Sequence, residues 1–132
     1  GKFLEVMARA LGYDIQGFGN EALAAEKVTT ISSMCTVFAE SEVTSLIARG
    51  QDRREIALGL HASVVRRVAA MIHRVAPDGD IVFTGGVAQN PCMRALLSKK
   101  LGRPVAYPHA PQFTGALGAA LLARAAGRAD DG

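Results

Sequence analysis

The chain has 132 residues, of which 49% are hydrophobic, 20% charged and 5% aromatic, and its 15 basic and 12 acidic side chains give a net charge of +3. This length supports one domain with a core, and the few aromatic residues argue against a stacking surface for single-stranded nucleic acid. The two cysteines, Cys35 and Cys92, form no metal-binding spacing and no disulfide framework. We therefore expect a cytoplasmic protein with no nucleic-acid partner and no apolar run long enough to span a membrane.

Apolar residues recur at helical spacing in three segments of the first half of the chain. The helices that they predict are 2–11, 36–49 and 53–75. The first two are expected to end at Gly12 and Gly50, because glycine readily adopts the conformation that terminates a helix. Asp52 is expected to cap the third helix, with Glu55 completing a capping box.

The segments between these helices are less regular. Residues 13–20 contain two glycines and predict a loop, whereas 22–28 fit either a short helix or an irregular stretch. Thr36 is the expected N-cap of the second helix. Because the chain starts directly at a helix, we interpret it as a piece of a longer protein.

The second half of the chain alternates strand and helix patterns after a turn at 77–79. The predicted elements are a strand at 80–84, a helix at 91–101, a strand at 104–107 and a helix at 113–126. This order predicts parallel strands, and two strands need further strands from elsewhere to make a stable sheet. The expected fold class is therefore α/β, helix-rich with a short parallel sheet, and the tail 127–132 is expected to be frayed.

A candidate ligand-binding turn follows the first predicted strand. The sequence Thr-Gly-Gly at 84–86 leads to a helix that Asn90 is expected to cap, with Pro91 in its first turn. Paired glycines allow close ligand approach, and a helix N-terminus at the end of a parallel strand favours an anion. The same residues fit a tight turn with no ligand, and the segment contains no P-loop or GxGxxG pattern. On spacing alone both interpretations stay open.

Four segments together resemble one protein family. They are GKFLE at 1–5, CTVFAESEV at 35–43, FTGGVAQN at 83–90 and QFTGALGAA at 112–120. They resemble the activator ATPases of 2-hydroxyacyl-CoA dehydratases and the ATPase subunits of benzoyl-CoA reductases, within the actin-like ATPase superfamily. The resemblance spans nearly the whole chain, and its most specific segment begins at Cys35. It implies that 1–132 is the C-terminal portion of one actin-like ATPase domain.

The resemblance also implies a nucleotide site for ATP or ADP with Mg²⁺. The residues that it assigns to this site are Gly85, Gly86, Val87 and Asn90. Asn90 would help to close the adenosine pocket, and Gln112 is a weaker candidate to face the nucleotide. Gly115 and Gly118 are expected to permit close helix packing beside the pocket. The catalytic base and the Mg²⁺ ligands are expected in the N-terminal part of such proteins, so no catalytic residue is named here.

Members of the resembled family hold one [4Fe-4S] cluster between two identical or similar subunits. By this resemblance Cys35 is a cluster ligand, and the helix that begins beside it has a positive end that favours a thiolate. The second ligand would lie just upstream of Gly1, in a Cys-Ala-Ala-Gly-Thr-Gly stretch. A dimer of this chain would offer two such thiolates where a cluster needs four, so the chain alone is not expected to hold one. Cys92 is expected to be structural.

The other polar candidates have simpler interpretations. Glu40 and Glu42 lie two apart on a helix and are expected to favour its dipole rather than to act in catalysis. The three histidines, His61, His73 and His109, are expected to be surface or partly packed residues. The implied activity is ATP-driven, low-potential electron transfer to a reductase or dehydratase partner. The rival interpretations are a fragment of a sugar or acetate kinase-like phosphotransferase and a non-catalytic nucleotide-binding module.

Overall fold

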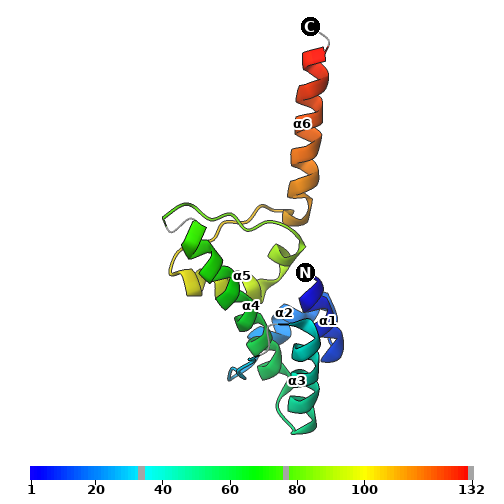
Figure 1. Ribbon diagram of the computed structural model, residues 1–132, viewed down its shortest axis with the longest axis vertical. Helices are drawn as coiled ribbons and strands as arrows, with labels where there is room; N and C mark the ends of the chain where they lie inside the picture. The colour runs from blue at the N-terminus through cyan, green and yellow to red at the C-terminus, as the bar shows by residue number, and fades with distance from the viewer. Residues whose placement is uncertain (33–34, 76–77, 131–132) are drawn as a thin grey trace.

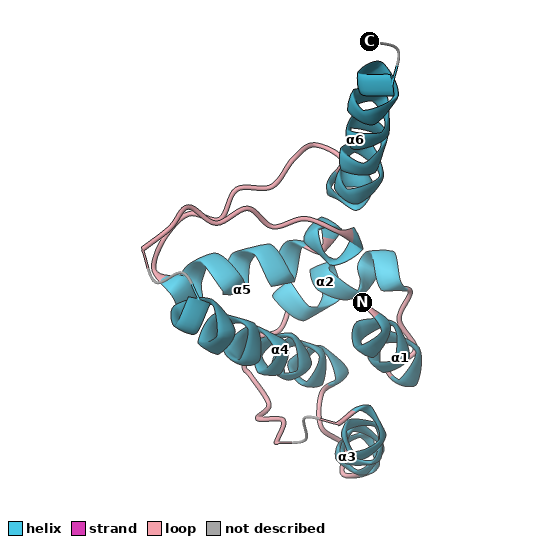
Figure 2. Ribbon diagram, turned by 45° about the horizontal axis from the view of Figure 1, so that its top comes forward, coloured by secondary structure: helices cyan, strands magenta, loops and turns pink. Residues whose placement is uncertain are grey.

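Helix α4 (Arg53–Val75) is the centre of the fold. The computed structural model describes residues 1–32, 35–75 and 78–130. In it α4 packs against α1 (Lys2–Ala10), α2 (Ile15–Leu23), α3 (Thr36–Ala48) and α5 (Pro91–Leu101), as Figures 1 and 2 show. The other described elements are the 3₁₀ turns η1 (Gly86–Gln89) and η2 (Pro111–Phe113) and the helix α6 (Thr114–Asp130). The bounds predicted for α4 and α5 are confirmed.

The length and apolar character of α4 follow from its central position. By length and composition α4 is apolar enough to cross a membrane, so the expectation that no such run exists is wrong. Its buried residues are Ile56, Ala57, Gly59, Leu60, His61, Ser63, Val65 and Ala69. A helix that packs on several sides needs apolar residues around much of its circumference. Packing in the core therefore accounts for the composition of α4.

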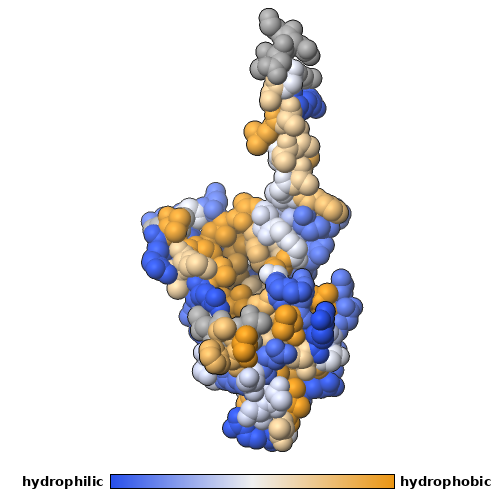
Figure 3. All heavy atoms as spheres, turned by 45° about the vertical axis from the view of Figure 1, so that its right-hand side comes forward, coloured by the Kyte–Doolittle hydropathy of each residue, from blue (hydrophilic) through white to orange (hydrophobic). Residues whose placement is uncertain are grey.

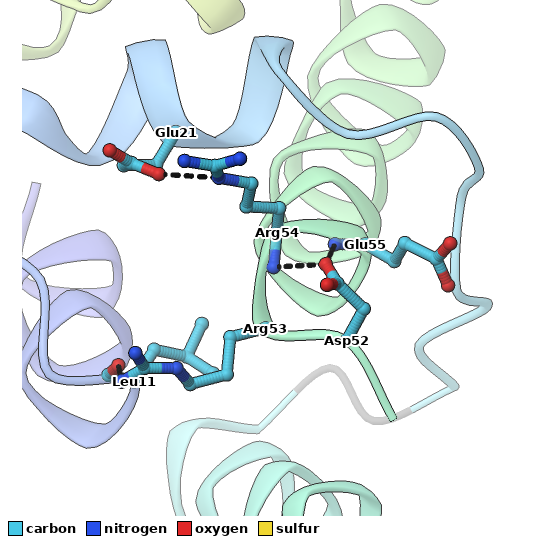
Figure 4. Close-up of polar contacts among 6 residues, drawn as sticks. All are labelled: Leu11, Glu21, Asp52, Arg53, Arg54 and Glu55. Carbon is cyan, nitrogen blue, oxygen red and sulfur yellow. Dashed lines mark hydrogen bonds and ion pairs between the residues drawn. The ribbon is translucent and has the colours of Figure 1, made fainter. Parts of the chain in front are cut away.

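Asp52 caps the N-terminus of α4, as the sequence predicts. Its Oδ1 accepts hydrogen bonds from the backbone N–H groups of Arg54 at 2.8 Å and Glu55 at 3.1 Å (Figure 4). The carboxylate of Glu55 accepts a hydrogen bond from Gln51 Nε2 at 2.6 Å. The cap thus satisfies two of the backbone donors that the first turn of a helix leaves without helical partners.

Two arginines beside this cap connect α4 to α1 and α2. Arg53 Nη1 donates to the carbonyl oxygen of Leu11 at 2.9 Å, directly after α1. Arg54 Nε lies 2.7 Å from Glu21 Oε2 on α2, and both side chains are partly exposed (Figure 4). An exposed ion pair contributes little to stability, so we assign these contacts mainly to fixing how the three helices meet.

Residues 15–23 form the helix α2, so the loop expected at 13–20 is wrong. The helix buries Phe18, Gly19 and Ala22 against the core. Asp14 occupies the N-cap position with an extended backbone. Two glycines within nine residues disfavour a helix in isolation, but tertiary packing selects it here.

The expected parallel sheet is not found as a sheet in the described residues. Val82 and Ala106 form an isolated parallel bridge. Ala106 O accepts from Phe83 N–H at 2.7 Å, and Ala106 N–H donates to Ile81 O at 3.0 Å. The two segments therefore run parallel, as expected for the predicted strands, but pair over too short a length to form named strands.

Helix α6 stands apart from the other helices in Figures 1 and 2 and contacts η2. It begins at Thr114 and continues to Asp130, beyond the end expected at 126. A side chain added at Gly115 or Gly118 would meet no described atom within 4 Å. The described part of the chain therefore shows no close packing at these glycines. In Figure 3 the projecting helix is mostly hydrophobic, and Leu122 is 74% exposed.

The Asp52 cap predicts a specific pair of stability effects. Asp52→Ala removes the acceptor for two backbone N–H groups and should lower the free energy of unfolding by about 1 kcal/mol. Asp52→Asn keeps an acceptor of similar capping strength and should stay close to wild type. Urea unfolding of the protein that contains this chain measures both. Equal losses in the two variants would contradict a capping role.

Candidate functional site

The turn at Gly85 and Gly86 is held in a conformation that requires glycine. Gly85 has φ +87° and ψ 175°, and side-chain-bearing residues rarely adopt such a positive φ. Its N–H donates to Pro111 O at 2.8 Å, directly before η2. Gly86 then begins η1, and a side chain built there would meet no described atom within 4 Å. The turn is thus fixed by its backbone and leaves the space in front of Gly86 open.

Asn90 caps α5 and also reaches back to α4. Its Oδ1 accepts from the Met93 N–H at 3.0 Å, the predicted N-cap bond. Its Nδ2 lies 2.9 Å from His61 Nε2, and His61 Nδ1 lies 2.7 Å from Ala57 O. The side-chain amide of Asn90 therefore links the first turn of α5 to the middle of α4.

His61 is fully buried, so the expectation of a surface or partly packed residue is wrong. Its ring lies 4.6 Å, between centroids, from the ring of Phe18 on α2. Burial lowers the pKa of His61 below its ordinary value, and the hydrogen bond to Ala57 opposes this in part. A sequence signal for the burial exists: Ala57, His61, Val65 and Ala69 form one row at four-residue spacing on α4, and all four are buried.

Gly19 lets α2 approach Asn90 closely. A Cβ at Gly19 would lie 2.5 Å from Asn90 Oδ1 and 2.8 Å from Pro91 Cδ. Both distances are shorter than van der Waals contact, so any other residue at Gly19 would push α2 and α5 apart. The amide of Asn90 is therefore enclosed by a bare helix surface in addition to its two hydrogen bonds.

A pocket of about 590 Å³ opens beside this turn. The residues that line it are Gly1, Leu4, Glu5, Ile15, Gln16, Gly86, Val87, Gln89 and Asn90. Three of the four residues predicted for the nucleotide site thus meet in one cavity, while Gly85 shapes the turn behind it. The walls from α1 and α2 were not predicted. The sequence offered one signal for them, the GKFLE segment, but no role for its individual residues.

Cys35 lies at the N-cap position of α3, where Thr36 was the expected cap. It is exposed, and it is followed by Val37 and Phe38, which are 68% and 67% exposed. Cys92 is buried in the core, and burial raises the pKa of its thiol to about 12. Cys92 is therefore a poor source of thiolate, which agrees with its predicted structural role.

The residues described here fit one ligand position for a metal cluster and no more. Within the described ranges no group of three or more His, Cys, Asp or Glu side chains could hold a metal ion. A conventional [4Fe-4S] cluster requires four thiolates, and this chain presents one exposed thiol, at Cys35. A complete site would need ligands from other residues or another subunit.

A short strap of extended chain, residues 29–32, ties the region before Cys35 to α4 and α3. Thr29 N–H donates to Glu55 O at 3.2 Å, and Arg66 Nη2 donates to Ile31 O at 3.1 Å. At the end of the strap, Ser32 donates to a Glu42 carboxylate oxygen through its N–H at 3.1 Å and its hydroxyl at 3.0 Å.

Gly59 makes this approach of the strap possible. A Cβ there would lie 1.9 Å from Thr29 O, so the strap could not lie against α4 if residue 59 carried a side chain. The strap therefore rests on the backbone of α4 itself.

The remaining candidates lie outside the pocket. Gln112 is exposed within η2 and does not line the cavity. His73 and His109 are exposed, as is Glu40. The structure does not bring these side chains together with the glycine turn.

Comparison with known proteins gives one consistent result. A sequence model of the BadF/BadG/BcrA/BcrD ATPase family matches residues 1–123. The (R)-2-hydroxyglutaryl-CoA dehydratase activating ATPase of Acidaminococcus fermentans is 44% identical over 93% of this chain and 47% of its own length. For the 2-hydroxyisocaproyl-CoA dehydratase activator of Clostridioides difficile the values are 38%, 93% and 46%. One of the subunits of the benzoyl-CoA reductase of Thauera aromatica is 35% identical over 92% and 45%.

A solved structure is similar over the whole chain. It is the activator of the 2-hydroxyisocaproyl-CoA dehydratase from Clostridium difficile with bound ADPNP. The TM-score is 0.91 at 36% identity, over 99% of this chain and 49% of that chain. The chain thus spans about half the length of the relatives and of the structure that it matches.

The approach at Gly19 predicts opposite effects for two glycines of α2. Gly19→Ala should destabilise the protein by about 1–3 kcal/mol, because the methyl group collides with the capped end of α5. A methyl group at Gly17 would have no described atom within 4 Å, so Gly17→Ala should be neutral or stabilise by up to about 1 kcal/mol. Urea unfolding compares the two. A Gly19→Ala protein as stable as Gly17→Ala would contradict the close approach.

Proposed function

Because the chain belongs to the BadF/BadG/BcrA/BcrD ATPase family, we propose that it is the C-terminal nucleotide-binding portion of a cytoplasmic iron–sulfur ATPase. In this proposal, ATP binding and hydrolysis drive low-potential electron transfer to a CoA-thioester dehydratase or reductase. The observation that carries the proposal is the pocket at the glycine turn, in a chain whose structural neighbour contains bound ADPNP.

The pocket has properties suited to a nucleotide. Its volume of about 590 Å³ lies within the usual range of small-ligand sites, which is roughly 300–1,000 Å³. Apolar walls from Leu4, Ile15 and Val87 suit a base or sugar face, and Glu5 and Gln16 supply polar groups. The helices α1, α2 and α5 all begin at its edge. Their positive ends favour an anionic ligand.

Cys35 is the residue of this chain proposed to ligate the metal. A [4Fe-4S] cluster held between two such subunits would supply the one-electron redox chemistry. Cys35 would contribute a thiolate from the start of α3, and the exposed Val37 and Phe38 beside it would be covered by the second subunit. ATP would bring Mg²⁺ with it, and we assign no described side chain to that ion.

Helix α4 offers a physical connection between the pocket and the Cys35 region. Gly59 supports the strap that precedes Cys35, and His61 holds Asn90 at the pocket. Residues two apart on an α-helix point about 200° apart, so the strap and the pocket cap lie on opposite faces of one helical turn. A nucleotide that binds two conformations with different affinity would shift their populations. Any such shift that displaces α4 acts on both regions.

Nucleotide binding to the full-length protein is the direct test of the proposal. We expect calorimetry to show ADP binding, and we expect Gly86→Leu to weaken it by about tenfold or more, because the new side chain enters the pocket without a clash in the protein. An unchanged unfolding midpoint in this variant serves as the control for folding. A wild-type protein that binds neither ADP nor ATP would overturn the proposal. ATP-dependent phosphorylation of a small metabolite would instead favour a kinase-like protein.

The two cysteines give a matched pair for the metal site. In the full-length protein, reconstituted with iron and sulfide without oxygen, Cys35→Ala should abolish the cluster absorbance and the bound iron. Cys92→Ala should retain both, because Cys92 is buried and its thiol resists ionisation. Normal iron content in Cys35→Ala would contradict the ligand assignment. The 132-residue chain alone should not form a stable cluster, and stoichiometric visible absorbance from it would overturn that expectation.

A further inference from the structure

The amide of Asn90 has no free hydrogen-bonding orientation, although Asn90 lines the pocket. Its Oδ1 accepts from Met93 N–H at 3.0 Å, and its Nδ2 faces His61 Nε2 at 2.9 Å. The bare surface of Gly19 closes off a further side. Asn90 is therefore held by the protein on several sides, and its own position depends on those contacts.

The hydrogen-bond partners fix the tautomer of His61. The backbone oxygen of Ala57 can only accept, so His61 Nδ1, 2.7 Å away, must donate to it. The N–H of Met93 can only donate, so the amide oxygen of Asn90 must face it and the amide nitrogen must face His61. A neutral ring with hydrogen on Nδ1 presents a lone pair at Nε2 and accepts that N–H. Every group in this chain of contacts is then satisfied.

We propose that His61 is a positioning residue for the nucleotide pocket, acting in its neutral Nδ1–H form through the side chain of Asn90. The inference rests on the proposed nucleotide site. His61 does not line the pocket; it holds the amide that caps α5 and so fixes the turn formed by η1 and the start of α5. Loss of its acceptor nitrogen leaves Asn90 Nδ2 buried without a partner and loosens this wall of the pocket.

Protonation of His61 has the same effect as loss of the acceptor. A proton on Nε2 would face the N–H₂ group of Asn90, so two donors would meet and the amide would have to turn away from its cap. The groups that contact the ring are Phe18 on α2, Asn90 before α5 and Ala57 on α4, and none of the three is charged. No neighbouring carboxylate among these contacts would stabilise the imidazolium.

The direction of the pH effect follows from burial. The pKa of His61 is lowered in the folded protein, chiefly by burial, so the neutral form persists at and above the ordinary histidine pKa of about 6.5. Stability and pocket geometry that depend on neutral His61 are therefore complete above about 6.5 and are lost as the pH falls through the lower, folded-state value.

The test uses three variants of the full-length protein and ADP as the ligand. His61→Leu keeps an apolar side chain but removes the acceptor, and ADP affinity should fall about tenfold at pH 8. His61→Gln places an amide oxygen near the position of Nε2, and it should restore most of that loss. Between pH 8 and 5.5, wild type should lose more affinity than His61→Gln, which cannot titrate. His73→Leu, an exposed histidine of the same helix, is the matched control and should follow wild type.

A spectroscopic measurement separates positioning from general packing. Nitrogen-15 chemical shifts of the His61 ring at pH 8 should show a hydrogen on Nδ1 and none on Nε2. The opposite tautomer would overturn the inference, as would a His61→Leu protein with wild-type affinity. A His61→Leu protein that unfolds leaves the His61→Gln comparison and the tautomer to decide. If wild type binds no nucleotide at pH 8, the proposed function fails and the inference with it; if wild type binds and the variants do not differ, the inference alone fails.

Discussion

The packing of α4 is the constraint on which the rest of the structure depends. This helix contacts α1, α2, α3 and α5 at once, so its side chains have little freedom to change without disturbing several neighbours. A buried position in such a helix must carry an apolar group, a glycine or a fully hydrogen-bonded polar group. Gly59 and His61 are instances of the last two, and each supports a segment that reaches a candidate functional residue.

Close backbone approach explains why glycine occurs inside two helices. Gly19 admits the capped start of α5, and Gly59 admits the carbonyl of Thr29. Each glycine costs a helix about 1 kcal/mol relative to alanine, a loss offset by the packing that it permits. The strap meets a further cost, because Thr29 Oγ1 is buried with no hydrogen-bond partner among the described residues. Its position against α4 is thus set by backbone contacts rather than by this side chain.

Local signals in the sequence predicted the caps, and contacts between distant segments decided what the sequence did not predict. Asp52 and Asn90 bond to N–H groups two or three residues away, so short motifs suffice to find them. The loop expected at 13–20 became α2 because Phe18 is buried by elements far along the chain. His61 was misplaced for a similar reason, since its partner Asn90 lies 29 residues away. The strand segments have few partners within the described residues, and they pair at a single bridge.

The enclosed amide of Asn90 also limits how the pocket can recognise a ligand. Both polar ends of this side chain are already used within the protein, so a ligand gains little from it directly. Direct polar contacts must then come from other lining groups, such as Glu5, Gln16 or Gln89, and from backbone at the turn. A wall fixed in advance reduces the ordering cost of binding. The contribution of Asn90 to affinity is therefore expected to be preorganisation, which explains how a residue as remote as His61 can control it.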